Sequence, residues 1–296
     1  MRYHIWTVGC QMNVADSRKL AAGLDRAGLA ASETIDDADL VVLNTCSVRE
    51  HAEDRAIGQL GRLKKQRQRG REVRIAVMGC MVGPRHDDLS RRFPYVDAFA
   101  RPQEFSPILE LAGIDDTGGE FWPSTFAAPD AVTAFVPVIH GCDKFCTYCI
   151  VPYRRGREAS RPIEDIRNEV EHYCARGVRE VTLLGQTVEA YGHDLPEAPD
   201  LGRTPDLGDL MRAIHDTPGL ERIRFLTSYP KDMTARIIDA VAELPKVCEH
   251  FNIPVQAGDD ALLERMRRGY TLAEYLEKFE LVRAKIPHAA MVTDII

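Results

Sequence analysis

The chain has 296 residues, of which 45% are hydrophobic and 28% charged, so it is long enough for two domains with separate cores. It has no apolar run of membrane-spanning length and no signal-peptide core near Met1, which predicts a cytoplasmic protein. The net charge of −7 argues against a uniformly basic nucleic-acid-binding protein, because contacts with phosphates require positive charge.

The first third of the sequence alternates strands and helices, which predicts an α/β domain with a doubly wound parallel sheet. We expect strands at residues 3–8, 39–43 and 73–78, and a fourth strand–helix unit near residue 96. The first predicted helix covers residues 13–27, with Asn13 as its N-cap. The second begins at Ser47 and runs toward Gly70.

Eight cysteines in a cytoplasmic chain indicate metal binding or catalysis rather than disulfides. Three of them, Cys10, Cys46 and Cys80, each follow the end of a predicted strand. Because the carboxyl ends of parallel strands share one edge of a sheet, we expect these thiols to lie together. Three structural cysteines in a core are the alternative. Their repeated position favours a site that holds a metal cluster through three thiolates.

Residues 113–133 contain glycine, proline and serine without a sustained period, which predicts a linker between domains 1–112 and 134–296. After the linker, we expect strands at 135–139, 180–184, 223–226, 250–255 and 289–296, separated by amphipathic helices. This pattern predicts a partial (βα) barrel whose active site lies at the carboxyl ends of its strands. Because the chain ends within a strand, we expect a truncated or incomplete gene product.

A second group of cysteines follows the first predicted barrel strand. Cys142, Cys146 and Cys149 have the spacing C-x3-C-x2-C within one short loop. Three thiolates so close can bind three irons of a cubane and leave the fourth iron without a protein ligand. Zinc ribbons normally use two separated C-x2-C pairs, so the spacing is not typical of zinc.

This loop resembles the cluster motif of radical S-adenosylmethionine (SAM) enzymes, and the following residues IVPYRRGRE at 150–158 resemble those of the methylthiotransferases. The further matches are GCQMN at 9–13, NTCSVR at 44–49, GCM at 79–81, LGQ at 184–186, NIPVQ at 252–256 and RGYT at 268–271. The motif GCQMN is similar to the branch that acts on N6-dimethylallyladenosine in tRNA (MiaB-type). The branch acting on threonylcarbamoyladenosine usually has GCKVN, and the branch acting on a ribosomal protein GCPKN.

The resemblance implies two [4Fe–4S] clusters, one bound by Cys10, Cys46 and Cys80 and one by Cys142, Cys146 and Cys149. SAM bound to the second cluster would yield a 5′-deoxyadenosyl radical that activates C2–H of the adenine at position 37 of tRNA. The first cluster would hold or supply the sulfur, and a second SAM would donate the methyl group. We expect the two clusters to face each other across one base. The resemblance further implies a monomer that acts on the tRNA anticodon stem-loop, with an electron donor such as flavodoxin or ferredoxin and a sulfur donor.

Other candidate residues lie around the second cysteine loop. Tyr148 could pack on SAM, and Gln186 and Gln256 could bond SAM or the base, with a structural role as the alternative for each. The basic side chains Arg154, Arg155 and Arg157 could bind tRNA phosphates or form a solvated surface. The sequence identifies no catalytic residue. Cys174 and Cys248 are expected in the core.

The chain also departs from the family pattern. It has GQTVEAY at 185–191 where the family often has GQNVNAY, SYP at 228–230 for SHP, and QAGDD at 256–260 for QSGSD. The resemblance implies further barrel strands and a C-terminal RNA-binding (TRAM) domain after Ile296, which we expect this chain to lack. Two alternatives therefore stay open. One is a sibling methylthiotransferase, and the other is an inactive fragment or a non-catalytic module that binds an iron–sulfur cluster or a metal.

Overall fold

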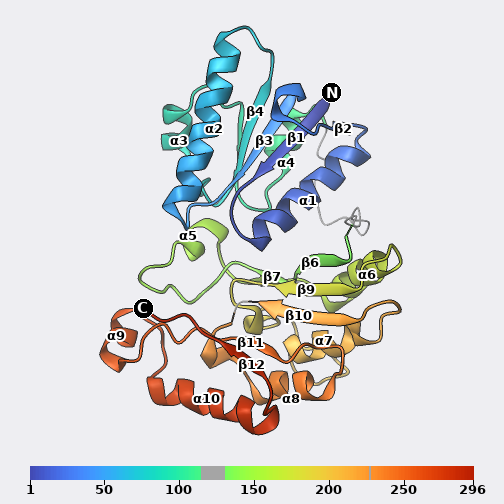
Figure 1. The fold of residues 1–296 in the computed structure, drawn as a ribbon, viewed down its shortest axis with the longest axis vertical. Coiled ribbons are helices and arrows are strands. Elements are labelled where there is room, and N and C mark those ends of the chain that lie inside the picture. The colour runs from blue at the N-terminus through green and yellow to red at the C-terminus, as the bar shows by residue number, and fades with distance from the viewer. Residues whose placement is uncertain (115–130, 227) are drawn as a thin grey trace. The chain divides into compact units, whose positions relative to one another are not determined.

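The computed structural model describes residues 1–114, 131–226 and 228–296 (Figure 1). The chain forms two compact units. The first contains Met1–Pro123 together with Tyr153–Arg155, and the second contains Ser124–Pro152 and Gly156–Ile296. Most of the predicted linker, residues 115–130, lies outside the described residues.

The first unit is a parallel sheet of five strands in the order β2-β1-β3-β4-β5. Helices cover both faces of this sheet, which confirms the predicted doubly wound fold (Figure 1). The strands are β1 (Arg2–Thr7), β2 (Ala30–Ala31), β3 (Leu40–Thr45), β4 (Arg74–Gly79) and β5 (Ala98–Ala100). The helices are α1 (Gln11–Arg26), the short η1 (Ile35–Asp37), α2 (Glu50–Gln68), α3 (Asp87–Arg92) and α4 (Ser106–Leu111).

The central strand β3 shows why the sheet needs helices on both sides. Its side chains alternate between two cores, as the period of two in a strand requires. Leu40 and Val42 pack in the core that includes α1 and α4, and Val41 and Leu43 pack in the core that includes α2. The strand is buried on both faces and reads as a continuous apolar run, which is typical of parallel sheets.

Two predicted helix starts are wrong. Helix α1 begins at Gln11 with Cys10 as its N-cap, so Asn13 lies inside the first turn. Helix α2 begins at Glu50 rather than at Ser47. Both polar side chains have tertiary partners instead, because Asn13 is buried beside β3 and Ser47 Oγ donates to the carbonyl of Cys80 at 2.8 Å.

The second unit is the predicted partial barrel. Strands β6 (Thr133–Pro137), β9 (Glu180–Leu184) and β10 (Arg222–Leu226) form a parallel sheet in the order β10-β9-β6. Strands β11 (His250–Asn252) and β12 (Ala290–Val292) form a parallel pair. The helices are α5 (Val151–Arg155, which straddles the two units), α6 (Ile163–Cys174), α7 (Leu207–His215), α8 (Ala235–Glu243), α9 (Asp260–Arg265) and α10 (Leu272–Lys285), with the short η2 (Val188–Ala190) and η3 (Pro230–Asp232).

The predicted first barrel strand, residues 135–139, is two strands. Strand β6 ends at Pro137, and β7 (Ile139–His140) pairs antiparallel with β8 (Ala159–Ser160). The partner strand follows the cysteine loop in the sequence, so the β7–β8 pair joins the two ends of that loop. Local apolar pattern cannot reveal a pairing with residues that come twenty positions later. None of the described helices combines the length and apolar character needed to cross a membrane.

Gly79, the last residue of β4, generates a testable prediction. It has φ +95°, and a Cβ there would lie 2.4 Å from the carbonyl oxygen of Thr45. Gly113 has a similar φ of +78°, but a Cβ there would meet no atom within 4 Å. Both substitutions to alanine incur the left-handed backbone cost of about 1–2 kcal/mol. We expect Gly79→Ala to lower the free energy of unfolding by about 1–3 kcal/mol more than Gly113→Ala, in urea denaturation. Equal losses would contradict a tight contact at Gly79.

Candidate metal centres

The cysteines of the first unit lie at one edge of its sheet. Cys10, Cys46 and Cys80 follow the carboxyl ends of β1, β3 and β4. The thiol of Cys80 is close enough to Cys46 and Cys10 for their charges to raise its pKa, in addition to the larger effect of burial. Cys46 and Cys80 are buried, whereas Cys10 is exposed. The structure therefore brings these three predicted ligands together.

A buried amide network fixes the backbone around these cysteines. The side chain of Asn13 donates to Asn44 Oδ1 at 2.8 Å and to the carbonyl of Thr45 at 3.0 Å. The side chain of Asn44 donates back to the carbonyl of Asn13 and to Ser17 Oγ, both at 2.8 Å. Asn13 and Asn44 are fully buried. Because an unpaired buried amide costs about 1–3 kcal/mol, the network holds the cysteine-bearing turns in one arrangement.

A buried ion pair lies beside the same thiols. Arg155 packs within the first unit, and its Nη2 lies 3.2 Å from Asp16 Oδ2. The side chains of Arg155 and Asp16 are 2% and 0% exposed. The Arg155 guanidinium also forms a hydrogen bond with the Cys80 side chain, which opposes the effect of burial on the pKa of that thiol.

The predicted phosphate-binding arginines have different environments. Arg155 is buried against Asp16 and is not placed to bind tRNA phosphate, which corrects the prediction for this residue. Arg154 is half-buried and lies against Gly83 within the first unit. Arg157 has an exposed side chain (78%) that pairs with Asp143 at 3.0 Å. For Arg154 and Arg157, binding of phosphate stays a prediction.

The second cysteine loop is held on several sides within the second unit. The Cys142 amide donates to the carbonyl of Gly156 at 3.1 Å, and its Sγ lies 3.4 Å from Thr187 Oγ1. The amide of Thr147 donates to the carbonyl of Met266 at 3.1 Å. Burial raises the pKa values of the Cys142 and Cys149 thiols.

Gly141 gives the loop its sharp start. It has φ +73°, and a Cβ at this position would lie 1.9 Å from the carbonyl oxygen of Arg157. A glycine directly precedes three of the six candidate ligands, and each of these glycines (Gly9, Gly79 and Gly141) has a positive φ. The repeated Gly-Cys pair in the sequence therefore has a physical cause, because the backbone before each cysteine passes too close to a neighbour for a side chain.

The sequence analysis assigned no role to two cations, Lys144 within this loop and Arg268 at the start of the RGYT motif. Lys144 Nζ lies 2.5 Å from Asp232 and 3.9 Å from Glu158, so carboxylates surround its charge. Arg268 is only 6% exposed, and its Nη1 donates to Cys146 Sγ at 3.2 Å. Arg268 belongs to a basic run, residues 265–268, whose other arginines are exposed. No feature of the run itself separates the buried arginine from its neighbours.

The predicted SAM contacts lie around the same loop. The Tyr148 hydroxyl accepts a hydrogen bond from Arg268 Nη1 at 3.3 Å, and half of the residue's surface is exposed. Gln186 lies two residues after the end of β9 and is half-buried. Gln256 has φ +69°, and its amide donates to the carbonyl of Asp294 at 3.0 Å. An uncommon φ such as that of Gln256 is typical of functional sites. The contacts of Tyr148, Gln186 and Gln256 with SAM stay predictions.

The motif GQTVEAY places a buried acid near this loop. Glu189 is 1% exposed, and burial raises its pKa to about 8. Its Oε2 accepts a hydrogen bond from the amide of Tyr229 at 3.2 Å. Both residues are departures from the family pattern.

Within the described ranges, no group of three or more His, Cys, Asp or Glu side chains converges closely enough to hold one metal ion. Three thiolates that bind three different irons of a cubane need not converge on one point. Binding of a cluster by each trio of thiols stays a prediction.

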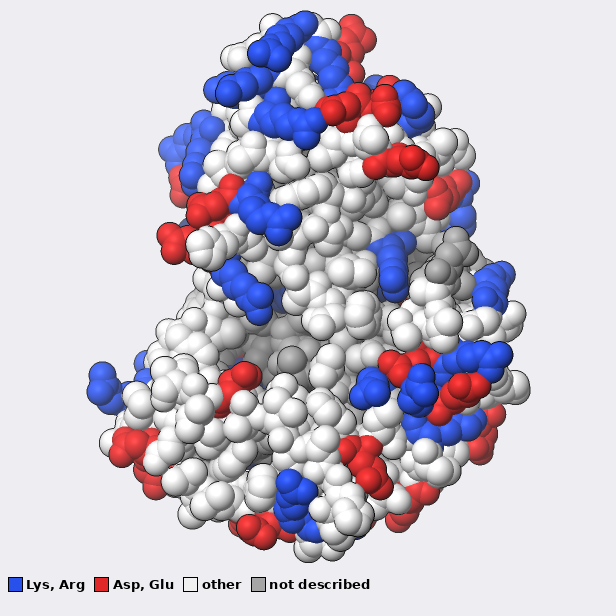
Figure 2. Space-filling model, viewed as in Figure 1, with Lys and Arg blue, Asp and Glu red and all other residues white. Residues whose placement is uncertain are grey.

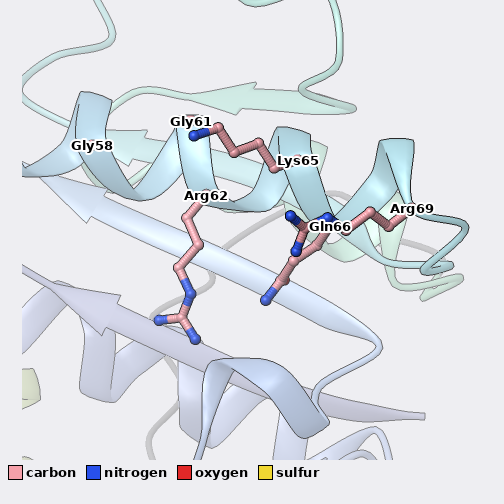
Figure 3. Close-up of a pocket in the computed structure, with 6 residues that line it drawn as sticks. All are labelled: Gly58, Gly61, Arg62, Lys65, Gln66 and Arg69. Atoms are coloured by element: carbon pink, nitrogen blue, oxygen red, sulfur yellow. The ribbon is translucent and has the colours of Figure 1, made fainter.

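The exposed face of α2 carries a shallow basic groove, lined by Gly58, Gly61, Arg62, Lys65, Gln66 and Arg69 (Figure 3). Asp36 pairs with Arg62 at 2.5 Å and accepts from Gln66 at 2.6 Å. Lys65 and Arg69 form no ion pair with any described residue. Lys and Arg side chains also gather elsewhere on the surface, so the acidic chain has local positive regions (Figure 2).

Comparison with known proteins agrees with these features. Residues 2–100 match the family described as "Uncharacterized protein family UPF0004", and residues 136–296 match the radical SAM superfamily. The chain is 45% identical over 298 residues to the tRNA-2-methylthio-N(6)-dimethylallyladenosine synthase of Herpetosiphon aurantiacus and 46% identical to that of a Roseiflexus species. The chain belongs to this family of radical SAM enzymes.

Each alignment covers all of the chain, which spans 67% of the length of the Herpetosiphon relative and 61% of the Roseiflexus relative. Membership confirms the predicted resemblance, and with it a transferase that uses [4Fe–4S] clusters and SAM. Solved structures of two radical SAM enzymes share the fold. OxsB with aqua-cobalamin bound has a TM-score of 0.67 and 13% identity, and the match covers 100% of this chain and 49% of OxsB. TsrM with cobalamin and a [4Fe–4S] cluster bound has a TM-score of 0.63 and 14% identity, and the match covers 99% of this chain and 68% of TsrM.

The buried pair of Arg155 and Asp16 generates a testable prediction. Arg155→Met leaves the Asp16 carboxylate buried without a partner, so we expect the free energy of unfolding to fall by about 3–5 kcal/mol in chemical denaturation. The double variant Asp16→Leu/Arg155→Met removes both charges and should recover most of the loss.

Arg157→Met is the matched control, because it removes an exposed arginine of an ion pair two residues away and should cost about 1 kcal/mol or less. A similar cost for Arg155→Met and Arg157→Met would contradict a buried, paired Arg155.

Proposed function

We propose that this chain adds a methylthio group to C2 of N6-dimethylallyladenosine at position 37 of tRNA, next to the anticodon, with two molecules of SAM consumed. The observation that carries the proposal is the pair of cysteine trios, each gathered within one compact unit. Relatives named tRNA-2-methylthio-N(6)-dimethylallyladenosine synthase, 45–46% identical over the whole chain, support the choice of substrate.

In this proposal, Cys10, Cys46 and Cys80 bind one [4Fe–4S] cluster, and a second cluster is bound in the barrel unit. The described surroundings fit a cluster, because each trio has buried thiols, a tight glycine turn and a buried guanidinium within hydrogen-bonding distance of one sulfur. When bound, the clusters and SAM supply the one-electron chemistry that an unreactive C–H bond requires.

The residues of the barrel unit then position the reactants. We assign Cys142, Cys146 and Cys149 as the ligands there, and Thr187 as a hydroxyl that keeps the Cys142 sulfur in place. Tyr148, with its half-exposed ring, can stack on a flat adenine. Gln186 and Gln256 remain assigned to SAM or the base, because both follow strands at the carboxyl edge of the barrel.

The substrate chemistry matches the need for an accessible base. An anticodon loop offers unpaired bases that a protein can draw out and stack on aromatic side chains. Binding of its phosphates needs local positive charge, which Arg157 and the groove residues Lys65 and Arg69 supply despite the acidic net charge. An external electron donor and a sulfur donor complete the proposed set of partners.

Iron content tests the two clusters. We expect about eight irons per chain after anaerobic reconstitution, from two four-iron clusters. Cys46→Ala and Cys146→Ala should each retain about four irons, because each removes one ligand of a different cluster. Iron and acid-labile sulfide analysis measures both values.

Cys174→Ala is the matched control, because Cys174 is buried in α6 outside both trios and should leave about eight irons. If Cys46→Ala retained the wild-type iron content, the cluster of the first unit would be ruled out.

Nucleoside analysis tests the substrate. The chain is expressed in a bacterial strain that lacks its own 2-methylthio-modifying enzyme, and digested tRNA is analysed by mass spectrometry. We expect 2-methylthio-N6-dimethylallyladenosine with the wild type and with Cys174→Ala, and none with Cys46→Ala or Cys146→Ala. A methylthio group on threonylcarbamoyladenosine would overturn the substrate while keeping the reaction. If the chain contained both clusters and still produced no modified nucleoside, its proposed activity would be overturned.

A further inference from the structure

Arg268 is a buried cation without a carboxylate partner. It lies in the turn between α9 and α10, and 6% of its surface is exposed. No Asp or Glu of the described chain lies within the 4.0 Å of an ion pair with its guanidinium, whereas Lys144, within the loop of Cys142, Cys146 and Cys149, has two such partners. Burying an isolated charge is costly, so the site requires an anion from elsewhere.

The contacts of the guanidinium show where that anion belongs. Nη1 donates to Cys146 Sγ at 3.2 Å and to the Tyr148 hydroxyl at 3.3 Å, and Nε donates to the Tyr270 hydroxyl at 3.1 Å. Phenols are neutral at pH 7, so neither tyrosine supplies a negative charge. Cys146 is the contact that becomes anionic when it binds iron as a thiolate.

Two aromatic rings hold the guanidinium in this position. Its Cζ lies 5.0 Å from the ring centroid of Tyr229 and 5.4 Å from that of Tyr270. The Tyr229 hydroxyl donates to the carbonyl of Arg268. Tyr270 in turn donates to the carbonyls of Pro254 and Val255 at 3.1 Å, so the support continues into the backbone after β11. The guanidinium is therefore fixed against the sulfur before any cluster binds.

We propose that Arg268 is the positioning residue that raises the reduction potential of the barrel cluster, through its charge and its hydrogen bond to the Cys146 sulfur. The inference rests on the proposed assignment of Cys142, Cys146 and Cys149 as cluster ligands. One-electron reduction, with the electron from an external low-potential donor, adds one negative charge to the cluster. A fixed cation and a hydrogen bond to a ligand sulfur stabilise the more negative state more strongly.

The test measures a potential in the Cys46→Ala background, where only the barrel cluster is expected. Arg268→Gln removes the charge and keeps a hydrogen-bond donor, Arg268→Met removes both, and Arg268→Lys keeps the charge. Arg265→Gln is the matched control, because it removes the same charge from an exposed residue three positions away. The reduced cluster is titrated against potential by electron paramagnetic resonance, and iron is counted in every sample.

We expect Arg268→Met to lower the ratio of reduced to oxidised cluster at least tenfold at a fixed potential, which is about 59 mV for one electron. Arg268→Gln should lie between Met and the parent, and Arg268→Lys and Arg265→Gln close to the parent. Loss of the cluster in Arg268→Met and Arg268→Gln but not in Arg268→Lys would overturn the tuning role, because the charge would then be needed for the cluster to bind rather than to set its potential.

The other outcomes overturn the inference. Unchanged potentials in Arg268→Gln and Arg268→Met with full iron would show that the arginine does not tune the cluster. Loss of the cluster in all three Arg268 variants, with Arg265→Gln intact, would show a purely structural role. If the Cys46→Ala parent itself held no cluster, the ligand assignment of the proposed function would fail before Arg268 was examined.

Discussion

The structure depends on one constraint, which is that the carboxyl ends of neighbouring parallel strands lie at the same edge of the sheet. In the first unit, β1, β3 and β4 are neighbours in one parallel sheet; Cys46 and Cys80 directly follow β3 and β4, and Cys10 lies three residues after the end of β1. The sheet therefore gathers three thiols that lie far apart in the sequence, without any local cysteine motif. In the barrel unit, the three thiols lie in one loop. This loop begins with a tight turn at Gly141, and the pairing of β7 with β8 holds its two ends together. Two separate geometric solutions produce the same set of donors.

The two trios differ in their electrostatic surroundings. A buried arginine reaches one sulfur of each, Arg155 at Cys80 and Arg268 at Cys146. Asp16 neutralises the first arginine, and tyrosine rings and hydroxyls surround the second without neutralising it. The charge of Arg268 therefore acts on the barrel thiols without a neutralising carboxylate, whereas Asp16 offsets the charge of Arg155 beside Cys80. This difference agrees with the proposed roles, in which Cys142, Cys146 and Cys149 would hold the cluster that supplies one-electron chemistry to SAM.

The sequence was sufficient for features with a local cause. Strand β9 coincides with its prediction, the predicted strands of the first unit and β10 lie within a few residues of theirs, and the six cysteines lie at or shortly after the expected strand ends and in the expected loop. The predicted strand at 135–139 is instead divided between β6 and β7, and those at 250–255 and 289–296 are shorter, because β11 ends at Asn252 and β12 at Val292. It was insufficient for side chains whose partners lie far along the chain. Arg155 and Asp16 are 139 residues apart, and Arg268 and Cys146 are 122 apart. Before such contacts are known, a buried arginine reads like its exposed neighbours, and an Asn such as Asn13 reads as a helix cap.

Two departures from the family pattern turn out to be one local feature. Glu189 stands where the family often has asparagine and Tyr229 where it often has histidine, and the Tyr229 amide donates to the Glu189 carboxyl. Because burial raises the pKa of Glu189 to about 8, its carboxyl stays largely protonated at neutral pH and brings little negative charge. The Tyr229 ring faces the cations of both Arg268 and Lys144. The two departures therefore place a tyrosine ring against both cations and a buried carboxyl group against the backbone of that tyrosine.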